Sequence, residues 1–274
     1  MLAILLHLLP ASLYALLAFH FWHRRRDSGV AAPRFGLHLW ERLLLLAAIA
    51  LQGMGLYGDL FPGDAMHFGF GYALALTLWL ALVVYWIETF YTRLEGLQTL
   101  VLPIAALCAI LPLMFPAQHT LSNVGSLVFR AHFTMAMLAY SLFTLAALHA
   151  LLMAAAERRL HRGRLSRALA SLPPLLVMES LLFRLIAIAF VMLTLTLATG
   201  IVFSETLFGK ALAFNHKTLF AMLSWVIFAA LLVGRHGYGW RGRKALRWTL
   251  AGFIALLLAY VGSRFVLEVI LGRT

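Results

Sequence analysis

The sequence predicts an all-α membrane protein, a polytopic helix bundle with about eight transmembrane helices. Of its 274 residues 63% are hydrophobic, and the mean hydropathy is +0.92. Only 12% of the residues are charged, which leaves too few to cover a water-facing surface. A spanning helix needs about 20 largely apolar residues, and runs of this kind recur along the whole chain.

Eight apolar segments separated by short loops are predicted to cross the bilayer. In order, they are Leu2–Trp22, Leu39–Tyr57, Phe68–Phe90, Leu97–Phe115, Ser126–Met153, Leu182–Phe203, Thr218–Val233 and Leu246–Ile270. In the longest loop, before the sixth segment, Pro173 and Pro174 are predicted to end the helical part, because proline cannot continue a helix. Pro103 is predicted to kink the fourth segment.

The basic residues predict how the bundle is oriented. When successive loops are assigned to alternating sides, all but five of the 22 Lys and Arg residues fall on one side. The positive-inside rule places that side in the cytoplasm. Both termini are therefore expected in the periplasm, and the protein in the bacterial inner membrane. The net charge of +12 then reflects topology, so we expect the lipid bilayer and no nucleic acid as a partner. The outer cations are Arg130, Lys210, Lys217, Arg264 and Arg273.

Several kinds of chemistry are excluded by what the sequence lacks. Cys108 is the single cysteine, so there is no internal disulfide, no CxxC redox pair and no CxxCH haem attachment site. The HExxH, GxSxG and GxxxxGK[ST] patterns of hydrolases and nucleotide-binding proteins are missing as well. We therefore predict no catalytic residues.

The most informative histidine is His132, one or two turns inside the outer end of the fifth segment. Tyr140 follows eight residues later, nearly on the same helix face. Ala136 and Ala139 between them leave room for a flat ligand or for a closely packed helix. A neutral imidazole nitrogen can bind iron axially, and His216, in the loop before the seventh segment, is a candidate for a second ligand. Taken alone, a histidine at a helix end is also explained as a polar anchor.

The stretch from Thr199 to Trp225 combines two apolar segments with a polar, aromatic loop between them. Such a loop can hold something flat and apolar at the water boundary, and we interpret this guest as haem. Phenylalanines in a membrane loop also serve as plain interfacial anchors, which is the alternative. The candidate haem-binding residues beside His132, His216 and Tyr140 are Phe208, Phe214, Asn215, Lys217 and Arg130.

Residues 181–205, the loop and the segments that follow it resemble the cytochrome c assembly family, of the CcsA, CcmC and CcmF type. The turn G-W-R-G-R-K at 239–244 and the ending Y-V-G-S-R-F at 260–265 carry the resemblance most specifically. Within this family the chain is similar to the short eight-helix branch, the YpjD-like inner-membrane proteins. The resemblance is best over residues 126–270. It divides the chain into an N-terminal two-helix segment, 1–66, and an assembly-type membrane domain, 67–271.

The resemblance implies that the protein handles haem on the outer face of the membrane. Family members carry a tryptophan-rich W-x-W-D-P-K loop, flanked by external histidines that ligate the iron. His132 matches the external histidine of the fifth segment, because the H-x7-Y spacing is kept. The tryptophan positions fall on Leu212 and Phe214, the aspartate on Asn215 and the proline on His216.

Two further family histidines have no counterpart. The second external histidine would fall near Leu271, and the intramembrane histidine of the second segment falls at about Gln52.

Two functions are thus weighed. The first is a haem-handling protein that delivers haem to an assembly partner, and the partner supplies the CxxCH motif and the reduced thiols. The alternative is a cofactor-free transporter or accessory subunit, for example in ion homeostasis, with Gln52 and Glu88 as its polar groups at membrane depth.

Overall fold

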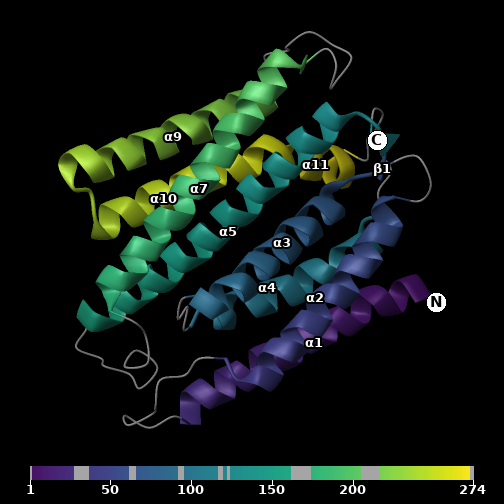
Figure 1. The fold of residues 1–274 in the computed structure, drawn as a ribbon, viewed down its shortest axis with the longest axis horizontal. Coiled ribbons are helices and arrows are strands. Elements are labelled where there is room, and N and C mark those ends of the chain that lie inside the picture. Colours follow the sequence, from purple (N-terminus) through teal and green to yellow (C-terminus); the bar gives the residue numbers. More distant parts are fainter. Residues whose placement is uncertain are drawn as a thin grey trace.

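The computed structural model describes residues 2–27, 37–61, 66–91, 96–116, 120–121, 124–161, 174–204 and 216–271. Its long helices are α1 (Leu2–Asp27), α2 (Leu39–Leu60), α3 (Phe70–Tyr91), α4 (Gln98–Met114), α5 (Leu127–His161), α7 (Leu175–Val202), α9 (His216–Tyr238) and α10 (Gly242–Leu257) (Figure 1). Beyond α10 the chain stays helical through the π-helical turn η1 (Leu258–Gly262), the short α11 (Ser263–Phe265) and the π-helical turn η2 (Val266–Ile270). The two-residue strands β1 (Met66–His67) and β2 (Thr120–Leu121) pair antiparallel. The predicted all-α bundle of eight helices is confirmed.

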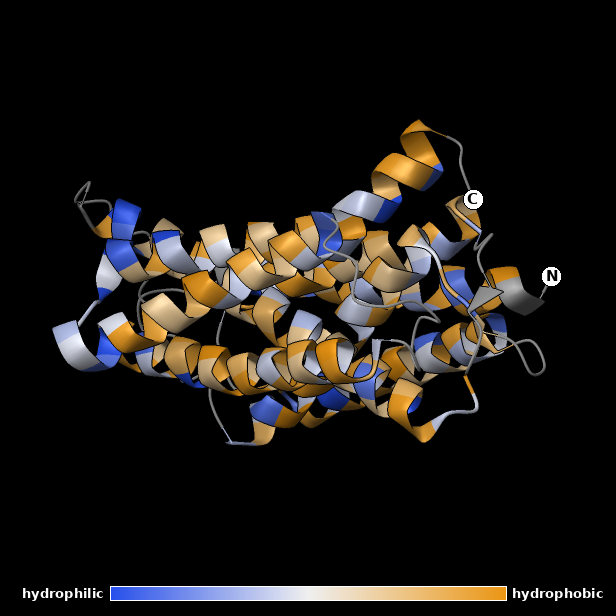
Figure 2. Ribbon diagram, turned by 90° about the horizontal axis from the view of Figure 1, so that it is seen from above, coloured by the Kyte–Doolittle hydropathy of each residue, from blue (hydrophilic) through white to orange (hydrophobic). Residues whose placement is uncertain are grey.

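The helices have the length and composition of membrane spans. Within the described ranges, seven helical segments are long and apolar enough to cross a bilayer. The eighth, α4, has 17 residues and is therefore about 26 Å long, a little less than the hydrocarbon core. Hydrophobic residues dominate along the helices in Figure 2. The chain is thus a multi-pass membrane protein, and the periplasmic position of both termini stays a prediction.

Helix α5 is the central element of the bundle. It has 35 residues and runs between α3 and α4 on one side and α7 and α10 on the other (Figure 1). Small side chains let its neighbours approach closely, and the fully buried Ala146 and Ala150 are examples. α5 therefore packs against both halves of the bundle.

The sixth helix differs from its predicted span. α7 begins at Leu175, directly after Pro174, whereas the span was predicted to begin at Leu182. The difference arises at Glu179, which interrupts the apolar run in the sequence but is buried in the structure. Its carboxylate accepts a short hydrogen bond from the Arg235 guanidinium of α9. This long-range pairing compensates the charge, so that the helix extends through it.

Helix pairs approach most closely at glycines. A Cβ atom at Gly71 of α3 would lie 2.8 Å from the Leu111 carbonyl oxygen of α4. A Cβ atom at Gly252 of α10 would lie 2.8 Å from the ring of Phe228 of α9, which stacks on Phe143 of α5 with centroids 3.9 Å apart. Tight packing of this kind holds membrane helices together where water supplies no hydrophobic driving force.

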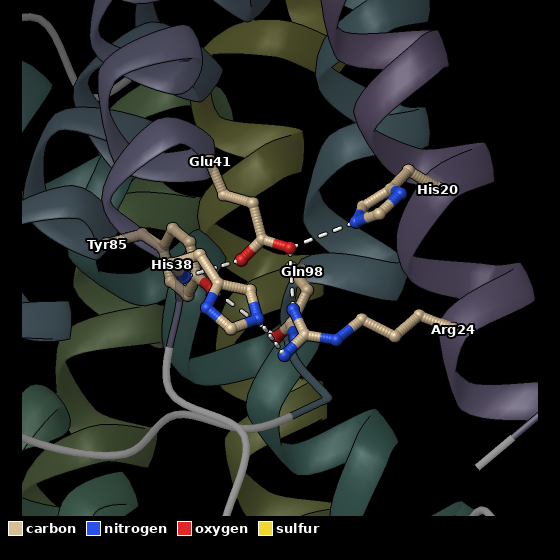
Figure 3. A network of polar contacts seen from close by, with 6 residues as sticks. All are labelled: His20, Arg24, His38, Glu41, Tyr85 and Gln98. Atoms are coloured by element: carbon tan, nitrogen blue, oxygen red, sulfur yellow. Dashed lines mark hydrogen bonds and ion pairs between the residues drawn. The ribbon is translucent and has the colours of Figure 1, made fainter.

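At the end predicted to face the cytoplasm, a buried carboxylate joins α1 to α2. Glu41 is fully buried and accepts hydrogen bonds from Arg24 at 2.6 Å and from the His38 backbone N–H at 2.7 Å. His20 lies 2.9 Å from the same carboxylate, and Figure 3 shows these side chains converging on it. The network fixes the N-terminal hairpin, far along the chain from the candidate haem residues.

Candidate functional site

His132 lies in the second turn of α5 and faces α7. Its half-buried imidazole has Nδ1 2.9 Å from the Thr199 hydroxyl oxygen. Gly200, the next residue of α7, lies against the same ring, where a Cβ atom would be 3.3 Å from Cε1. A larger residue at position 200 would crowd the imidazole. The last turn of α7 therefore both positions this ring and leaves space for it.

The hydrogen bonds of Thr199 favour one tautomer of His132. The Thr199 hydroxyl has one hydrogen, and the backbone carbonyl oxygens of Leu195 at 2.8 Å and Thr196 at 3.1 Å are both within its reach. When the hydrogen is donated to either carbonyl, the hydroxyl oxygen accepts a hydrogen from His132 Nδ1. In a neutral imidazole of this form, Nε2 carries the lone pair that binds metals. A hydrogen bond to the other ring nitrogen is how proteins orient histidine ligands.

Tyr140 lies on the same helix but has a structural contact of its own. The side chain is buried, and its hydroxyl donates a 2.8 Å hydrogen bond to the Leu256 carbonyl oxygen of α10. This bond joins the middle of α5 to the C-terminal helical segment just before the π-helical turn η1. The hydroxyl is engaged there, and a contact between the Tyr140 ring and haem stays a prediction.

The other predicted site residues lie at the same end of the bundle or outside the described ranges. His216 is the exposed first residue of α9, and Lys217 beside it is half-buried. Arg130 is exposed, and its Nε donates to the Val124 carbonyl oxygen at 2.9 Å. α9 packs against α7 where the Trp225 indole donates to Thr194 at 2.9 Å. Three candidates fall outside the described residues: Phe208, Phe214 and Asn215.

The few metal-binding side chains at this end of the bundle suit a metal that is already held by other ligands, as the iron of haem is. Among the described residues, no group of three or more His, Cys, Asp or Glu side chains could hold a metal ion. A single imidazole ligand fits the axial position of a haem iron, which already has four porphyrin nitrogens.

Sequence reasoning missed a polar ladder between α1 and α2. His7 Nε2 lies 2.7 Å from the Asp59 carboxylate, and the Tyr14 hydroxyl donates to Gln52 Oε1 at 2.8 Å. Within the described structure, His7 Nδ1 and Gln52 Nε2 are buried without a hydrogen-bond partner. Each helix contributes residues seven positions apart, which is two turns. The seven-residue spacing of these polar residues could have been recognised in the sequence. Asp59 was overlooked because it lies beyond Tyr57, the predicted end of the second span.

A second missed cluster surrounds Arg264 in α11. This guanidinium is buried, and its NH1 nitrogen lies 3.6 Å from Glu268, one turn further along the helix. Lys217 interacts electrostatically with both side chains. The i, i+4 spacing of Arg264 and Glu268 indicates a local ion pair in the sequence, but only the structure shows that Lys217 joins them.

The fold defines a polytopic helical membrane protein whose central helix carries an imidazole hydrogen-bonded to the neighbouring helix α7. The chain belongs to the cytochrome c assembly protein family, whose model matches residues 39–271.

The chain is similar in sequence to several bacterial proteins, two of which are compared first. The inner membrane protein YpjD of Escherichia coli strain K12 is 34% identical over 152 residues, which is 56% of each chain. The cytochrome c biogenesis protein CcsA of Prochlorococcus marinus strain MIT 9515 is 34% identical over 88 residues, 32% of this chain and 28% of that protein.

A third relative matches nearly end to end. It is a 28.8 kDa protein of Azospirillum brasilense, encoded in the 5′ region of a nifR3-like gene, and it is 29% identical over 98% of this chain and 96% of its own. The match to the Escherichia coli protein, by contrast, spans little more than half its length. No solved structure is significantly similar. The family match covers the described helices from α2 onward and agrees with the multi-pass helical fold.

Proposed function

We propose that this protein holds haem at the outer face of the inner membrane, with His132 as an axial ligand, and delivers it to a cytochrome c assembly partner. The observation that supports this most directly is the hydrogen bond between His132 and Thr199, because a hydrogen bond at one ring nitrogen is how proteins orient histidine ligands. The partner supplies the CxxCH motif and the reduced thiols, since this chain has one buried cysteine.

The proposed orientation follows from charge. The positive-inside rule assigns the His132 end of α5 to the periplasm, where c-type cytochromes acquire their haem. His216 and Lys217 begin α9 at the same end, where His216 is the candidate for the opposite axial ligand and Lys217 a cation for a propionate. The redox chemistry would be that of the haem iron. The protein would orient the haem, surround it with apolar side chains and place cations near its carboxylates.

The test is a haem spectrum of the full-length protein purified in detergent after growth with added haem precursor. We expect a Soret band of the b type, and His132→Ala should remove or strongly diminish it. His236→Ala is the matched control, because His236 is an exposed histidine at the opposite end of α9. His216→Ala should convert a six-coordinate spectrum into a five-coordinate one.

Two results would overturn the proposal. One is the lack of any Soret band after haem supplementation while size-exclusion chromatography shows folded protein. The other is an unchanged band in a well-folded His132→Ala variant.

A cofactor-free transport function is the second candidate, and the polar ladder between α1 and α2 favours it. A buried amide nitrogen of Gln52 and a buried imidazole nitrogen of His7, both without a partner in the described structure, are unusual at membrane depth. If transport is the function, Gln52→Leu abolishes uptake of the substrate in vesicles and His132→Ala leaves it intact. The reverse pattern excludes transport through the ladder.

A further inference from the structure

A group of charged side chains lies buried at the outer end of the bundle, beside the proposed haem site. We define the outer cation cluster as Arg264, Glu268 and Lys217. Arg264 is only 8% exposed, Glu268 is largely covered and Lys217 is half-buried. The cluster brings the first turn of α9 together with α11 and the turn η2, which follow it by more than 40 residues in the chain.

The charges within this cluster do not balance. Two cations face one carboxylate, and this carboxylate has another task, because Glu268 Oε2 accepts a 2.9 Å hydrogen bond from the Phe70 backbone N–H. Phe70 begins α3, so Glu268 caps that helix and satisfies one of its unpaired amide groups. Among the described residues, these three side chains therefore carry one positive charge in excess in a region of low polarity, where an uncompensated charge is costly.

An unsatisfied donor shows where an anion fits. Arg264 Nε is buried and has no hydrogen-bond partner within the described structure. Glu268 Oε1 is also buried without a partner there, but as an acceptor it calls for a donor and not for an anion. The Arg264–Glu268 ion pair is long, at 3.6 Å, which is beyond hydrogen-bonding distance. A guanidinium is a planar fork that binds a carboxylate through two parallel hydrogen bonds, and part of this fork remains unused.

The backbone around Arg264 is unusual as well. The π-helical turns η1 and η2 lie immediately before and after α11, so Arg264 stands between two widened turns. Single π-helical turns inside α-helices are frequently found at functional sites. A regular α-helix would place residues 260, 264 and 268 in one line, and the widened turns shift them out of it.

The cluster is linked to the proposed haem site by aromatic contacts. The Arg264 guanidinium lies 5.8 Å from the ring centroid of Tyr260, and Tyr260 contacts Phe68 at 5.7 Å. Phe68 in turn contacts Phe133 edge to face at 5.2 Å, and Phe133 directly follows His132 in α5. On the other side, Lys217 directly follows His216. The outer cation cluster is thus connected, through these side chains, to the helix turns that carry both candidate iron ligands.

We propose that the outer cation cluster binds a carboxylate of the guest, with Arg264 as the principal anchor and Lys217 as a second cation. This inference rests on the proposed function, in which the carboxylate is a haem propionate. It identifies the ligand class of the site as a flat apolar molecule with an anionic edge. A single imidazole ligand leaves the haem free to rotate about the bond between iron and imidazole. Binding of a propionate by Arg264 would fix that rotation.

The test compares haem with haem dimethyl ester, in which both carboxylates are neutral. Binding to the full-length protein in detergent is measured by absorbance titration. We expect the wild type to bind the free acid about tenfold or more tightly than the ester, which is typical for the loss of a charge-assisted hydrogen bond. Arg264→Gln should bring this ratio close to one and keep the Soret position that His132 determines. The matched control is Arg243→Gln, an exposed arginine paired with Glu157 at the inner end.

A buried arginine is a risk for folding, so a second variant accompanies the first. Arg264→Gln combined with Glu268→Gln removes both charges of the pair and avoids leaving a lone buried carboxylate. Lys217→Gln, at a half-buried position, should lower the ratio by a few-fold. Retention of the full preference for the free acid in all three variants would overturn the inference.

Iron-free protoporphyrin separates this inference from the proposed function, because it needs no axial ligand. If protoporphyrin binds in an Arg264-dependent way and haem gives no ligated spectrum, the carboxylate site stands and the haem function fails. If wild-type protein binds haem and its dimethyl ester equally well, the haem function stands and the carboxylate site fails. If phosphatidylglycerol instead occupies the cluster in native mass spectra and Arg264→Gln removes it, the cluster binds lipid phosphate and the inference is wrong.

Discussion

Replacing Thr199 with valine tests the orientation of His132 with almost no change in shape. Valine has the same outline as threonine, but a methyl group stands in the place of the hydroxyl. The substitution removes the 2.9 Å contact to His132 Nδ1 and leaves α5 and α7 packed as before. The imidazole then loses the group that fixes its tautomer and its rotation.

The expected magnitude follows from the kind of interaction that is lost. Removal of a hydrogen-bond partner behind a histidine ligand typically lowers metal affinity by about 10- to 100-fold. The ring of His132 is half-buried, so water partly replaces the hydroxyl, and we expect about tenfold weaker haem binding. That is a free-energy change of about 1.4 kcal/mol. Thr199→Ser keeps the hydroxyl and should keep most of the affinity.

The assay is a haem titration of wild type, Thr199→Val, Thr199→Ser and Thr196→Val by Soret absorbance. Thr196 is the matched control, because its hydroxyl donates to the Met192 carbonyl oxygen one turn earlier in the same helix. Equal affinity of Thr199→Val and wild type, together with loss of the band in His132→Ala, would refute the reasoning about the tautomer and leave His132 as a ligand. Loss of affinity in Thr196→Val would show a general effect of altering α7.

Three further substitutions test other parts of the structure. Gly200→Ala places a Cβ atom 3.3 Å from Cε1 of His132 and should weaken haem binding by a few-fold without lowering the melting temperature. Gly71→Ala would bring a methyl group within 2.8 Å of the Leu111 carbonyl oxygen, and a loss of about 1–3 kcal/mol of stability in thermal unfolding is expected. Glu41→Ala removes a buried carboxylate at the inner end and should cost about 2 kcal/mol of stability while haem binding stays unchanged. A normal melting temperature would contradict the packing argument for Gly71→Ala and the hydrogen-bond argument for Glu41→Ala.

The number and order of the helices followed from hydropathy alone, because a bilayer requires each span to satisfy its own backbone hydrogen bonds. The boundaries were less predictable where a charge lies inside a helix. Glu179 made the sixth span look shorter, since its partner Arg235 is 56 residues away in the sequence. A local window of residues contains no information about such a partner. The same reasoning explains why Asp59, paired with His7 across 52 residues, was not recognised.

The candidate site was predictable only in part, and for the same physical reason. His132 stood out because an imidazole near a helix end at membrane depth is rare enough to notice. Its partner Thr199 was part of the conspicuous stretch before the loop, but its hydrogen bond to the imidazole depends on how α5 and α7 face each other. Arg264 was recognised as an outer cation, and its burial against Glu268 and Lys217 became visible only in three dimensions.

The substitution Tyr140→Phe separates a structural role of this residue from a role in binding. The hydroxyl donates to the Leu256 carbonyl oxygen, so phenylalanine leaves one buried carbonyl without its donor and should cost about 1 kcal/mol of stability. The aromatic ring remains, and the contact between His132 and Thr199 lies two turns away toward the outer end of α5. Haem affinity should therefore change by less than about twofold, within the effect of a distant site. A loss of haem binding as large as that expected for Thr199→Val would show that the Tyr140 hydroxyl exchanges its backbone partner for the haem, and that α5 moves when the guest binds.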